Sequence, residues 1–250
     1  MELQELVTFL DEYLAIGQVP DSENALNGLQ VEGRREVRRL AAAVDASEAS
    51  IRAAVAANCD VLLVHHGLFW DGNRPVTGPR YRRLAALLES GMALYSAHLP
   101  LDVHPEVGNN VLLARRLGLE VLGGFGDYKG MELGVWGEVS LSREALSSRL
   151  VEVLGQAPRL IPGGGDPVRR LAVVTGGGGG FVQAAAAVGM DGLVTGEGTH
   201  HTYFDAVEGG VNVWYCGHYA TETFGVAALA QHLSERFDLD WTFLDLPTGL

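Results

Sequence analysis

Hydrophobic and polar positions follow two different periods along this chain. Apolar side chains three or four residues apart over residues 3–16 predict an amphipathic helix that ends at Gly17, and residues 20–33 are expected to form a loop. Beyond the loop, short apolar runs alternate with helical patterns. The predicted strands are 39–44, 60–64, 92–97, 133–140, 159–161, 171–175, 192–195, 211–216 and 241–246. The predicted helices are 47–57, 81–90, 105–117, 143–154, 181–188, 202–208 and 222–237.

This alternation predicts an α/β fold with layered, largely parallel or mixed sheets flanked by helices. Residues 40–67 and 171–198 are weakly similar, and the same order of elements surrounds both segments. The order favours two pseudo-repeated, intertwined halves, although unrelated α/β units can also look alike. We therefore expect a first α/β half with the N-terminal helix at 1–120, a connecting segment at 121–170 and a second α/β half at 171–250.

Composition and charge exclude several classes of protein. Of the 250 residues 47% are hydrophobic and 20% are charged, which is typical of a globular protein. A net charge of −13 makes nucleic acid an unexpected partner, because such a surface needs a basic stripe. No apolar stretch is long enough to span a membrane and no signal-peptide pattern is present, so a cytoplasmic location is expected. Two cysteines, Cys59 and Cys216, are too few for a disulfide framework or a thiolate zinc site.

Histidines and carboxylates gather where predicted strands end. Seven of the eight histidines follow a strand, and His232 is the exception. Because carboxyl ends of parallel strands meet at one edge of a sheet, these side chains are expected to form a site. The residues concerned are His65 and His66, His98 and Asp102, Glu197 with His200 and His201, and His218 and Glu222. His104 and His232 are expected to be structural.

Imidazole and carboxylate ligands together suit a divalent transition ion such as Zn, Mn, Fe or Ni. Adjacent His65 and His66 point to different sides of an extended chain, so this pair can serve two neighbouring ions. Glu222, at the start of a predicted helix, has two oxygens with which to bridge them. One histidine after a strand is more often a hydrogen-bonded loop residue. The pair together with two His-x-x-x-carboxylate motifs, which begin at His98 and His218, favours a metal site.

Four segments resemble the signatures of a known family. They are VLLVHHGLFW (61–70), SAHLPLDVHPEVGNN (96–110), VTGEGTHHTYFDA (194–206) and CGHYATE (216–222). The family is that of the dinuclear-metal hexameric proteins, also called the Nif-three-like family or GTP cyclohydrolase 1 type 2 homologues. The resemblance covers the whole chain, in the short form without the inserted domain of longer members. It departs at Leu99-Pro100, where the family usually has threonine-asparagine.

The resemblance implies a set of five metal ligands and two divalent transition-metal ions per subunit. His66 and Asp102 would complete one ion, His65 and His218 the other, and Glu222 would bridge them. It also implies a closed homo-oligomer, a hexamer. The apolar Leu68, Phe69 and Trp70 after the histidine pair are expected to form a subunit interface or a wall of the ligand pocket.

Two functions from different classes remain open. The first is a metal-dependent hydrolase that acts on a nucleotide-like or other small anionic substrate, with Glu197, His98 and His201 as catalytic residues that move protons. The second is a non-catalytic, metal-loaded oligomeric scaffold or partner-binding protein. A nucleic-acid clamp is a third idea, disfavoured by the charge.

The glycine run at residues 176–180 follows a strand and precedes a helix. Its backbone N–H groups could hold a phosphate, but no Gly-Lys-Ser/Thr follows as in a Walker loop. A strand-to-helix turn without a ligand is the favoured interpretation. No Gly-x-Ser-x-Gly elbow exists, so the sequence excludes the α/β-hydrolase interpretation.

Overall fold

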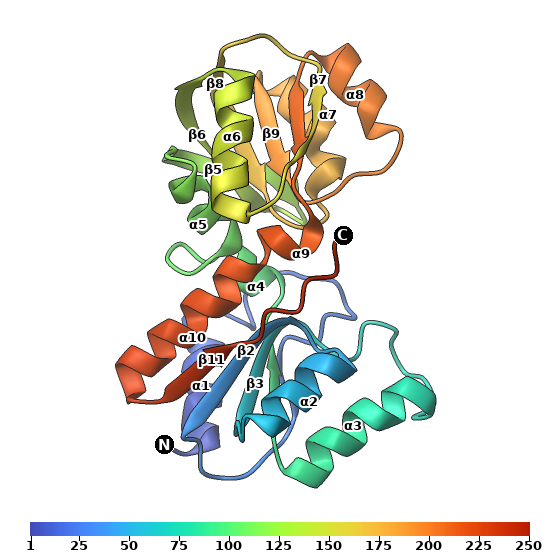
Figure 1. Cartoon of the computed structure of the whole chain (residues 1–250), viewed down its shortest axis with the longest axis vertical. Helices are drawn as coiled ribbons and strands as arrows, with labels where there is room; N and C mark the ends of the chain where they lie inside the picture. The colour runs from blue at the N-terminus through green and yellow to red at the C-terminus, as the bar shows by residue number, and fades with distance from the viewer. The chain divides into compact units, whose positions relative to one another are not determined.

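The chain folds around two mixed β-sheets, each with helices on its faces (Figure 1). The computed structural model describes all 250 residues. Contacts divide it into unit 1, Met1–Leu101 with Gly225–Leu246, and unit 2, Asp102–Phe224 with Pro247–Leu250. The predicted fold class, α/β with mixed sheets flanked by helices, is confirmed.

Unit 1 contains a five-stranded sheet in the order β1-β4-β3-β2-β11. The strands β4, β3, β2 and β11 are parallel, and β1 pairs with β4 in the antiparallel direction. The elements are α1 (Leu3–Tyr13), β1 (Gly28–Val31), β2 (Arg39–Asp45), α2 (Glu48–Ala56), β3 (Val61–His66), α3 (Gly78–Ser90), β4 (Ala93–Ser96), α4 (Leu99–Asp102), α10 (Thr223–Phe237) and β11 (Asp240–Phe243).

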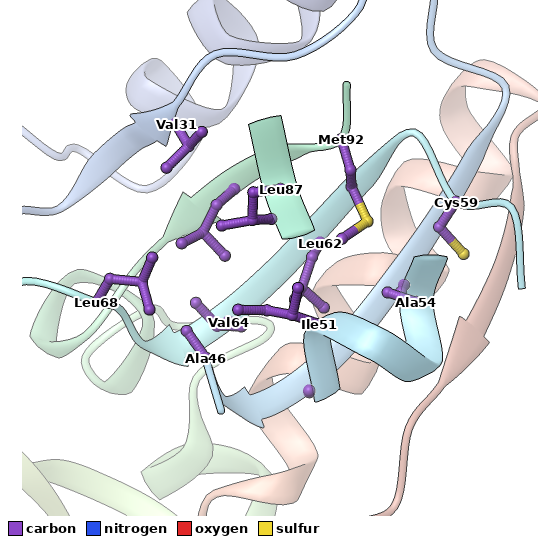
Figure 2. Packing of buried hydrophobic residues seen from close by; sticks show 13 residues of the cluster. Val31, Ala46, Ile51, Ala54, Cys59, Leu62, Val64, Leu68, Leu87 and Met92 are labelled. Atoms are coloured by element: carbon purple, nitrogen blue, oxygen red, sulfur yellow. The ribbon is translucent and has the colours of Figure 1, made fainter. Parts of the chain in front are cut away.

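Both faces of the unit 1 sheet are buried, which explains the continuous apolar runs of its strands. Figure 2 shows one face, where Ile51 of α2 packs against Leu62 and Val64 of β3. Leu87 of α3 belongs to the same buried cluster. On the other face, the Tyr95 hydroxyl of β4 donates a hydrogen bond of 2.8 Å to Asp11 of α1. Two covered faces fix the ends of β3 and β4, from which the histidines extend.

Unit 2 contains a six-stranded sheet in the order β5-β6-β8-β9-β10-β7. Here β8, β9 and β10 are parallel, while β7, β6 and β5 join in antiparallel pairs. The elements are α5 (Asn109–Arg116), β5 (Glu120–Tyr128), β6 (Met131–Leu141), α6 (Arg143–Leu154), β7 (Arg159–Pro162), β8 (Val168–Val174), the 3₁₀ turn η1 (Gly178–Phe181), α7 (Val182–Ala187), β9 (Gly192–Thr195), α8 (Thr202–Gly209), β10 (Asn212–Tyr215) and α9 (His218–Thr221).

Successive residues of β8 supply two different cores. Leu171 and Val173 pack with the helices α5 and α6 on one face of the sheet. Ala172 and Val174 pack with α7 and α8 on the other face. This period of two is what an extended strand requires when helices cover both of its faces.

The two sheets repeat one arrangement. In each sheet, an edge strand precedes three consecutive parallel strands that are joined by helices, and it pairs antiparallel with the third of them. In unit 1, β1 precedes β2, β3 and β4 and pairs with β4. In unit 2, β7 precedes β8, β9 and β10 and pairs with β10. The shared order supports the pseudo-repeat that the sequence suggested. The compact units nevertheless have other bounds than the halves expected from the sequence, because β11 returns to pair with β2 of unit 1.

Some elements differ from those predicted. The strand β1 lies in the segment that was predicted to be a loop, and β5 lies where neither a helix nor a strand was predicted. The helix predicted at 105–117 begins only at Asn109, since the ring of His104 accepts hydrogen bonds from the N–H groups of Glu106 and Val107 and holds a turn there. The helix predicted at 222–237 is confirmed as α10, which begins one residue later, and the short helix α9 before it was not predicted. No helix of the structure has both the length and the apolar character that crossing a membrane requires.

Candidate metal-ligating residues

The histidines of unit 1 extend from the carboxyl ends of two neighbouring parallel strands. His65 and His66 end β3, and His98 lies two residues beyond the end of β4. The register of these strands pairs Val64 with Ser96, which brings both ends to the same edge of the sheet. His65 is fully buried, whereas His66 and His98 are half-buried. The predicted clustering at a strand edge therefore holds within this unit.

Each of these imidazoles is held through Nδ1 by an oxygen. His65 Nδ1 lies 2.9 Å from the carbonyl oxygen of Ala97, which can only accept, so Nδ1 carries the proton. His66 Nδ1 lies 2.9 Å from Oδ1 of Asp45, and His98 Nδ1 lies 2.9 Å from Oδ1 of Asp21. Hydrogen bonding at Nδ1 leaves the lone pair on Nε2, which is the form in which histidine binds a metal ion.

The three rings lie close together. One ring nitrogen from each of His65, His66 and His98 lies within 4.8 Å of the others. The ring centroids of His65 and His98 are 4.9 Å apart, and those of His65 and His66 are 4.7 Å apart. His98 was expected to move protons, but its ring lies beside His65 and His66, the two expected ligands. Three convergent nitrogens could hold a metal ion.

Trp70 packs against this histidine group. Its ring is edge-on to His98 at a centroid distance of 4.8 Å and edge-on to His66 at 6.0 Å. Leu68 is buried in the core, and the ring of Phe69 lies under the guanidinium of Arg80. Of the two roles expected for these apolar residues, the contacts of Trp70 favour a wall beside the histidines.

Asp21 is a buried carboxylate behind His98 that the sequence analysis did not identify. Burial raises its pKa, but hydrogen bonding and attraction to His98, with further bonds from Asn27 and from the N–H of Ser22, outweigh this and lower the pKa below its usual value. Asp21 also accepts from the N–H of Leu99, at 3.0 Å. The sequence placed Asp21 in an undifferentiated loop, so no signal marked it.

Asp45, the carboxylate behind His66, was missed although the sequence contained a signal. It ends β2, and the register of β2 and β3 pairs it directly with His66. A carboxylate at the end of a strand beside a histidine-bearing strand is a natural partner for the imidazole. The strand pairing that places Asp45 there becomes visible only in the fold.

Unit 2 carries a second group around His218. The Nδ1 atom of His218 lies 2.9 Å from Oε1 of Glu197, and its Nε2 atom lies 3.2 Å from Oε2 of Glu222. Glu222 is buried and Glu197 is exposed. The loop after β9 and the turn after β10 place these three residues together, as strands β9 and β10 are parallel neighbours.

Two carboxylates around one imidazole stabilise its charged form. The hydrogen bond with Glu222 is the main cause that raises the pKa of His218 to about 9. Burial opposes this rise, whereas attraction to Glu222 and the contact with Glu197 reinforce it. In the protein without metal, a proton therefore occupies Nε2 at neutral pH. A divalent ion between His218 and Glu222 would replace that proton, because a ligating imidazole must be neutral.

The glycine run allows the backbone to approach this group. A Cβ on Gly176 would overlap the Glu222 carboxylate and lie 3.2 Å from Nε2 of His218. The N–H of Gly179 donates to the carbonyl oxygen of Glu197 at 3.0 Å, and the N–H of Glu197 donates to that of Gly176 at 2.9 Å. The run is thus a packed turn that positions Glu197 and Glu222, and it continues into a 3₁₀ turn before α7.

Asp102 is a buried carboxylate fixed by two asparagines. Its Oδ1 accepts a hydrogen bond of 2.8 Å from Asn109, and its backbone carbonyl accepts one of 3.2 Å from Asn110. Asn110 in turn accepts from the N–H of Thr175, at the end of β8. This network fixes the Asp102 side chain at the start of unit 2. The asparagine pair stands in the segment 96–110 that carried the resemblance, but no role was assigned to it there.

The remaining histidines and the cysteines lie elsewhere. The ring of His201 is exposed and contacts the Thr199 hydroxyl at 3.0 Å. His232 stacks on Tyr13 with centroids 4.6 Å apart, which agrees with the structural role expected for it. Both cysteines are buried and unbonded to each other, and burial raises the pKa of Cys216 to about 12. A thiol of that pKa is protonated, as expected of a core residue.

The donor set fits a borderline divalent ion. Buried or half-buried imidazoles and carboxylates, each oriented by a second polar group, are the arrangement that transition-metal sites in proteins use. The structure therefore contains buried His, Asp and Glu groups that could hold metal ions.

Comparisons with known proteins identify one family over nearly the whole chain. A family model described as Duf34/NIF3 (NGG1p interacting factor 3) matches residues 1–248. The chain is 46% identical to a GTP cyclohydrolase 1 type 2 homolog of Deinococcus radiodurans, with 98% of this chain and 94% of the relative covered. A protein of the same description from Archaeoglobus fulgidus is 44% identical, with both chains fully covered.

Solved structures show the same fold over the full length. The crystal structure of TTHA1606 from Thermus thermophilus has a TM-score of 0.92 at 47% identity, with 100% of both chains covered. The protein ybgI, described as of unknown function, has a TM-score of 0.94 at 40% identity, also with full coverage. The chain belongs to the Duf34/NIF3 family, whose relatives here are described as GTP cyclohydrolase 1 type 2 homologs.

Proposed function

We propose that this protein binds two divalent transition-metal ions and acts as a hydrolase on a nucleotide-like or other small anionic substrate. The proposed ligands are His65, His66, Asp102, His218 and Glu222. One observation carries the proposal: every histidine of this set has an oxygen acceptor at Nδ1, which leaves Nε2 for an ion. The same five positions are those that the resemblance of the sequence segments implies.

The division of ligands between the ions follows from the resemblance. His66 and Asp102 would hold one ion, His65 and His218 would hold the other, and Glu222 would be the ligand that both share. Both carboxylates of this set are almost fully buried, with 5% of Asp102 and 2% of Glu222 exposed. A buried carboxylate is costly unless a cation or donors compensate it, so burial supports a role in binding ions.

Divalent ions, when bound, polarise an electrophilic group and make water a better nucleophile near neutral pH. They also supply positive charge to a chain that has 31 acidic and only 18 basic residues. An anionic substrate is therefore the class that such a site attracts.

The chain's own residues would position ligands and move protons. Glu197 accepts a hydrogen bond from Nδ1 of His218 and orients that ring. His98 is hydrogen-bonded through Nδ1 to Asp21, which leaves the lone pair on Nε2 to accept a proton, as a general base requires. His201, exposed on the loop after Glu197, is the third proposed proton-transfer residue.

The test compares metal-loaded protein with Glu222→Gln on a panel of GTP, other nucleotides and phosphomonoesters. Glu208→Gln, an exposed glutamate of α8, is the matched control. We expect consumption of at least one compound by the wild type and the control, and a loss of roughly 100-fold or more in Glu222→Gln. A metal-loaded wild type that consumes nothing would contradict the hydrolase and favour the scaffold function.

A further inference from the structure

A cavity of about 480 Å³ lies in unit 2, at the edge of the sheet where β7 and β10 meet α8. Arg159 of β7 and Tyr215 of β10 are direct partners in the antiparallel pairing, and Ile161 lies two residues further along β7. The Tyr215 hydroxyl is hydrogen-bonded to Thr202, the first residue of α8. Paired strands and an anchored helix thus form a fixed wall. The volume is in the range of small-molecule sites.

The cavity carries a positive charge in an acidic protein. The side chain of Arg159 is exposed and forms no hydrogen bond or ion pair within the chain. By contrast, Arg35, Arg52 and Arg82 are each paired with a glutamate. None of the nine residues that line the cavity is acidic. A guanidinium without a carboxylate partner favours an anionic ligand, and its planar fork matches a phosphate or a carboxylate.

Aromatic rings also line the cavity. Tyr203 is 48% exposed and Phe204 is 50% exposed, although rings of this size are usually covered in a folded protein. Phe204 is edge-on to Tyr203 at 5.5 Å and to His200 at 5.8 Å. Such exposed rings offer a stacking surface for a planar apolar group.

We propose that this cavity binds a small molecule that combines a planar aromatic or heteroaromatic ring with a phosphate or similar anionic group. Arg159 would bind the anion, and Tyr203 and Phe204 would contact the ring. Nucleoside monophosphates belong to this class. Residues 198–200 line the cavity directly after Glu197, the residue that holds His218. The inference rests on the proposed function in that the ligand would be its substrate or product.

The experiment is calorimetric titration with GMP, AMP, UMP and phenyl phosphate, on protein as purified and after removal of metal by chelation. Arg159→Gln and Phe204→Ser change exposed side chains and should leave the fold intact, which circular dichroism checks. Their matched controls are Arg169→Gln and Tyr81→Ser, which are also exposed and lie outside the cavity.

We expect at least one of the four compounds to bind with and without metal. Each cavity variant should weaken it by about tenfold or more, and the controls should leave it unchanged. Retained binding in metal-free protein separates this cavity from the proposed metal site. The proposal is overturned if no compound binds below about 1 mM, or if binding disappears with the metal and is unchanged in Arg159→Gln.

Discussion

Gly176 and Glu222 approach each other so closely that no side chain fits between them. A Cβ on Gly176 would lie 3.0 Å from Cδ of Glu222 and would overlap its Oε1 atom. Gly176 also has a φ of +62°, a conformation that favours glycine. The N–H of Gly176 is bonded to the Thr221 hydroxyl, which fixes the turn from the other side. The position of the Glu222 carboxylate therefore explains why the glycine run includes Gly176.

Gly176→Ala should lower the free energy of unfolding and reduce metal content together, because the added methyl group displaces Glu222. The matched control is Gly130→Ala, since Gly130 also has a positive φ, +82°, but has no neighbour within 4 Å of the added atom. The control should cost about 1 kcal/mol from backbone strain alone. Denaturant unfolding and elemental analysis measure both effects. Equal losses in the two variants would contradict the steric role of Gly176.

His218 should titrate far above ordinary histidines in metal-free protein. Its pKa is raised to about 9, by Glu222 first, against an ordinary value of 6.5. The charged form is stabilised by folding, so this contribution is complete below pH 6.5 and is lost as pH rises through about 9. NMR titration of the histidine ring protons checks the pKa directly.

The variant His218→Gln should remove this pH dependence of unfolding between pH 6.5 and about 9. We expect the contribution to be about 3 kcal/mol in metal-free protein. His200→Gln is the control, as His200 is exposed. A slope that persists in His218→Gln would show that another group causes it.

Asp45→Asn should weaken metal binding by about 10- to 100-fold without changing any proposed ligand, because it removes the charge that orients His66. Asp127→Asn, on the exposed surface of β5, should have no effect. Competition with a metal-sensitive dye measures the affinity. Unchanged affinity in Asp45→Asn would mean that the carboxylate is not coupled to a metal ligand.

Trp70→Ala tests whether Trp70 belongs to a subunit interface or to the wall beside the histidines. Assembly is a prediction from the family resemblance: a homo-oligomer, a hexamer, is expected by light scattering, and a species of 26.7 kDa would contradict it. Because Trp70 contacts His66 and His98, we expect Trp70→Ala to retain the oligomer and alter metal or ligand binding. Dissociation with unchanged metal binding would assign Trp70 to the subunit interface instead.

Local patterns predicted much of the fold. The helix Arg143–Leu154 has the predicted bounds because Ser142 accepts the N–H of Ala145 and caps it. The strand Gly192–Thr195 is likewise an isolated apolar run between turn residues. By contrast β5 contains Gly123, Gly124 and Gly126, which hide an alternating pattern.

The sequence allowed the candidate ligands to be predicted, but not the residues that orient them. Strand-end positions indicated His65, His66 and His218, because the end of a parallel strand is a property of the local sequence. Asp21 comes to His98 from 77 residues away, a distance in sequence that only folding closes. The short helix α9 was also missed, since its four residues are too few for a helical period to be recognised.

The most direct test of the account is the metal content of protein purified without chelator, measured by elemental analysis on the wild type, His65→Ala and Asp102→Ala. We expect two transition ions per chain in the wild type. We expect a selective loss in each variant, since His65 and Asp102 are proposed to serve different ions. Wild-type protein that is stable without metal and has no measurable affinity for zinc or manganese would contradict the proposed two-ion site.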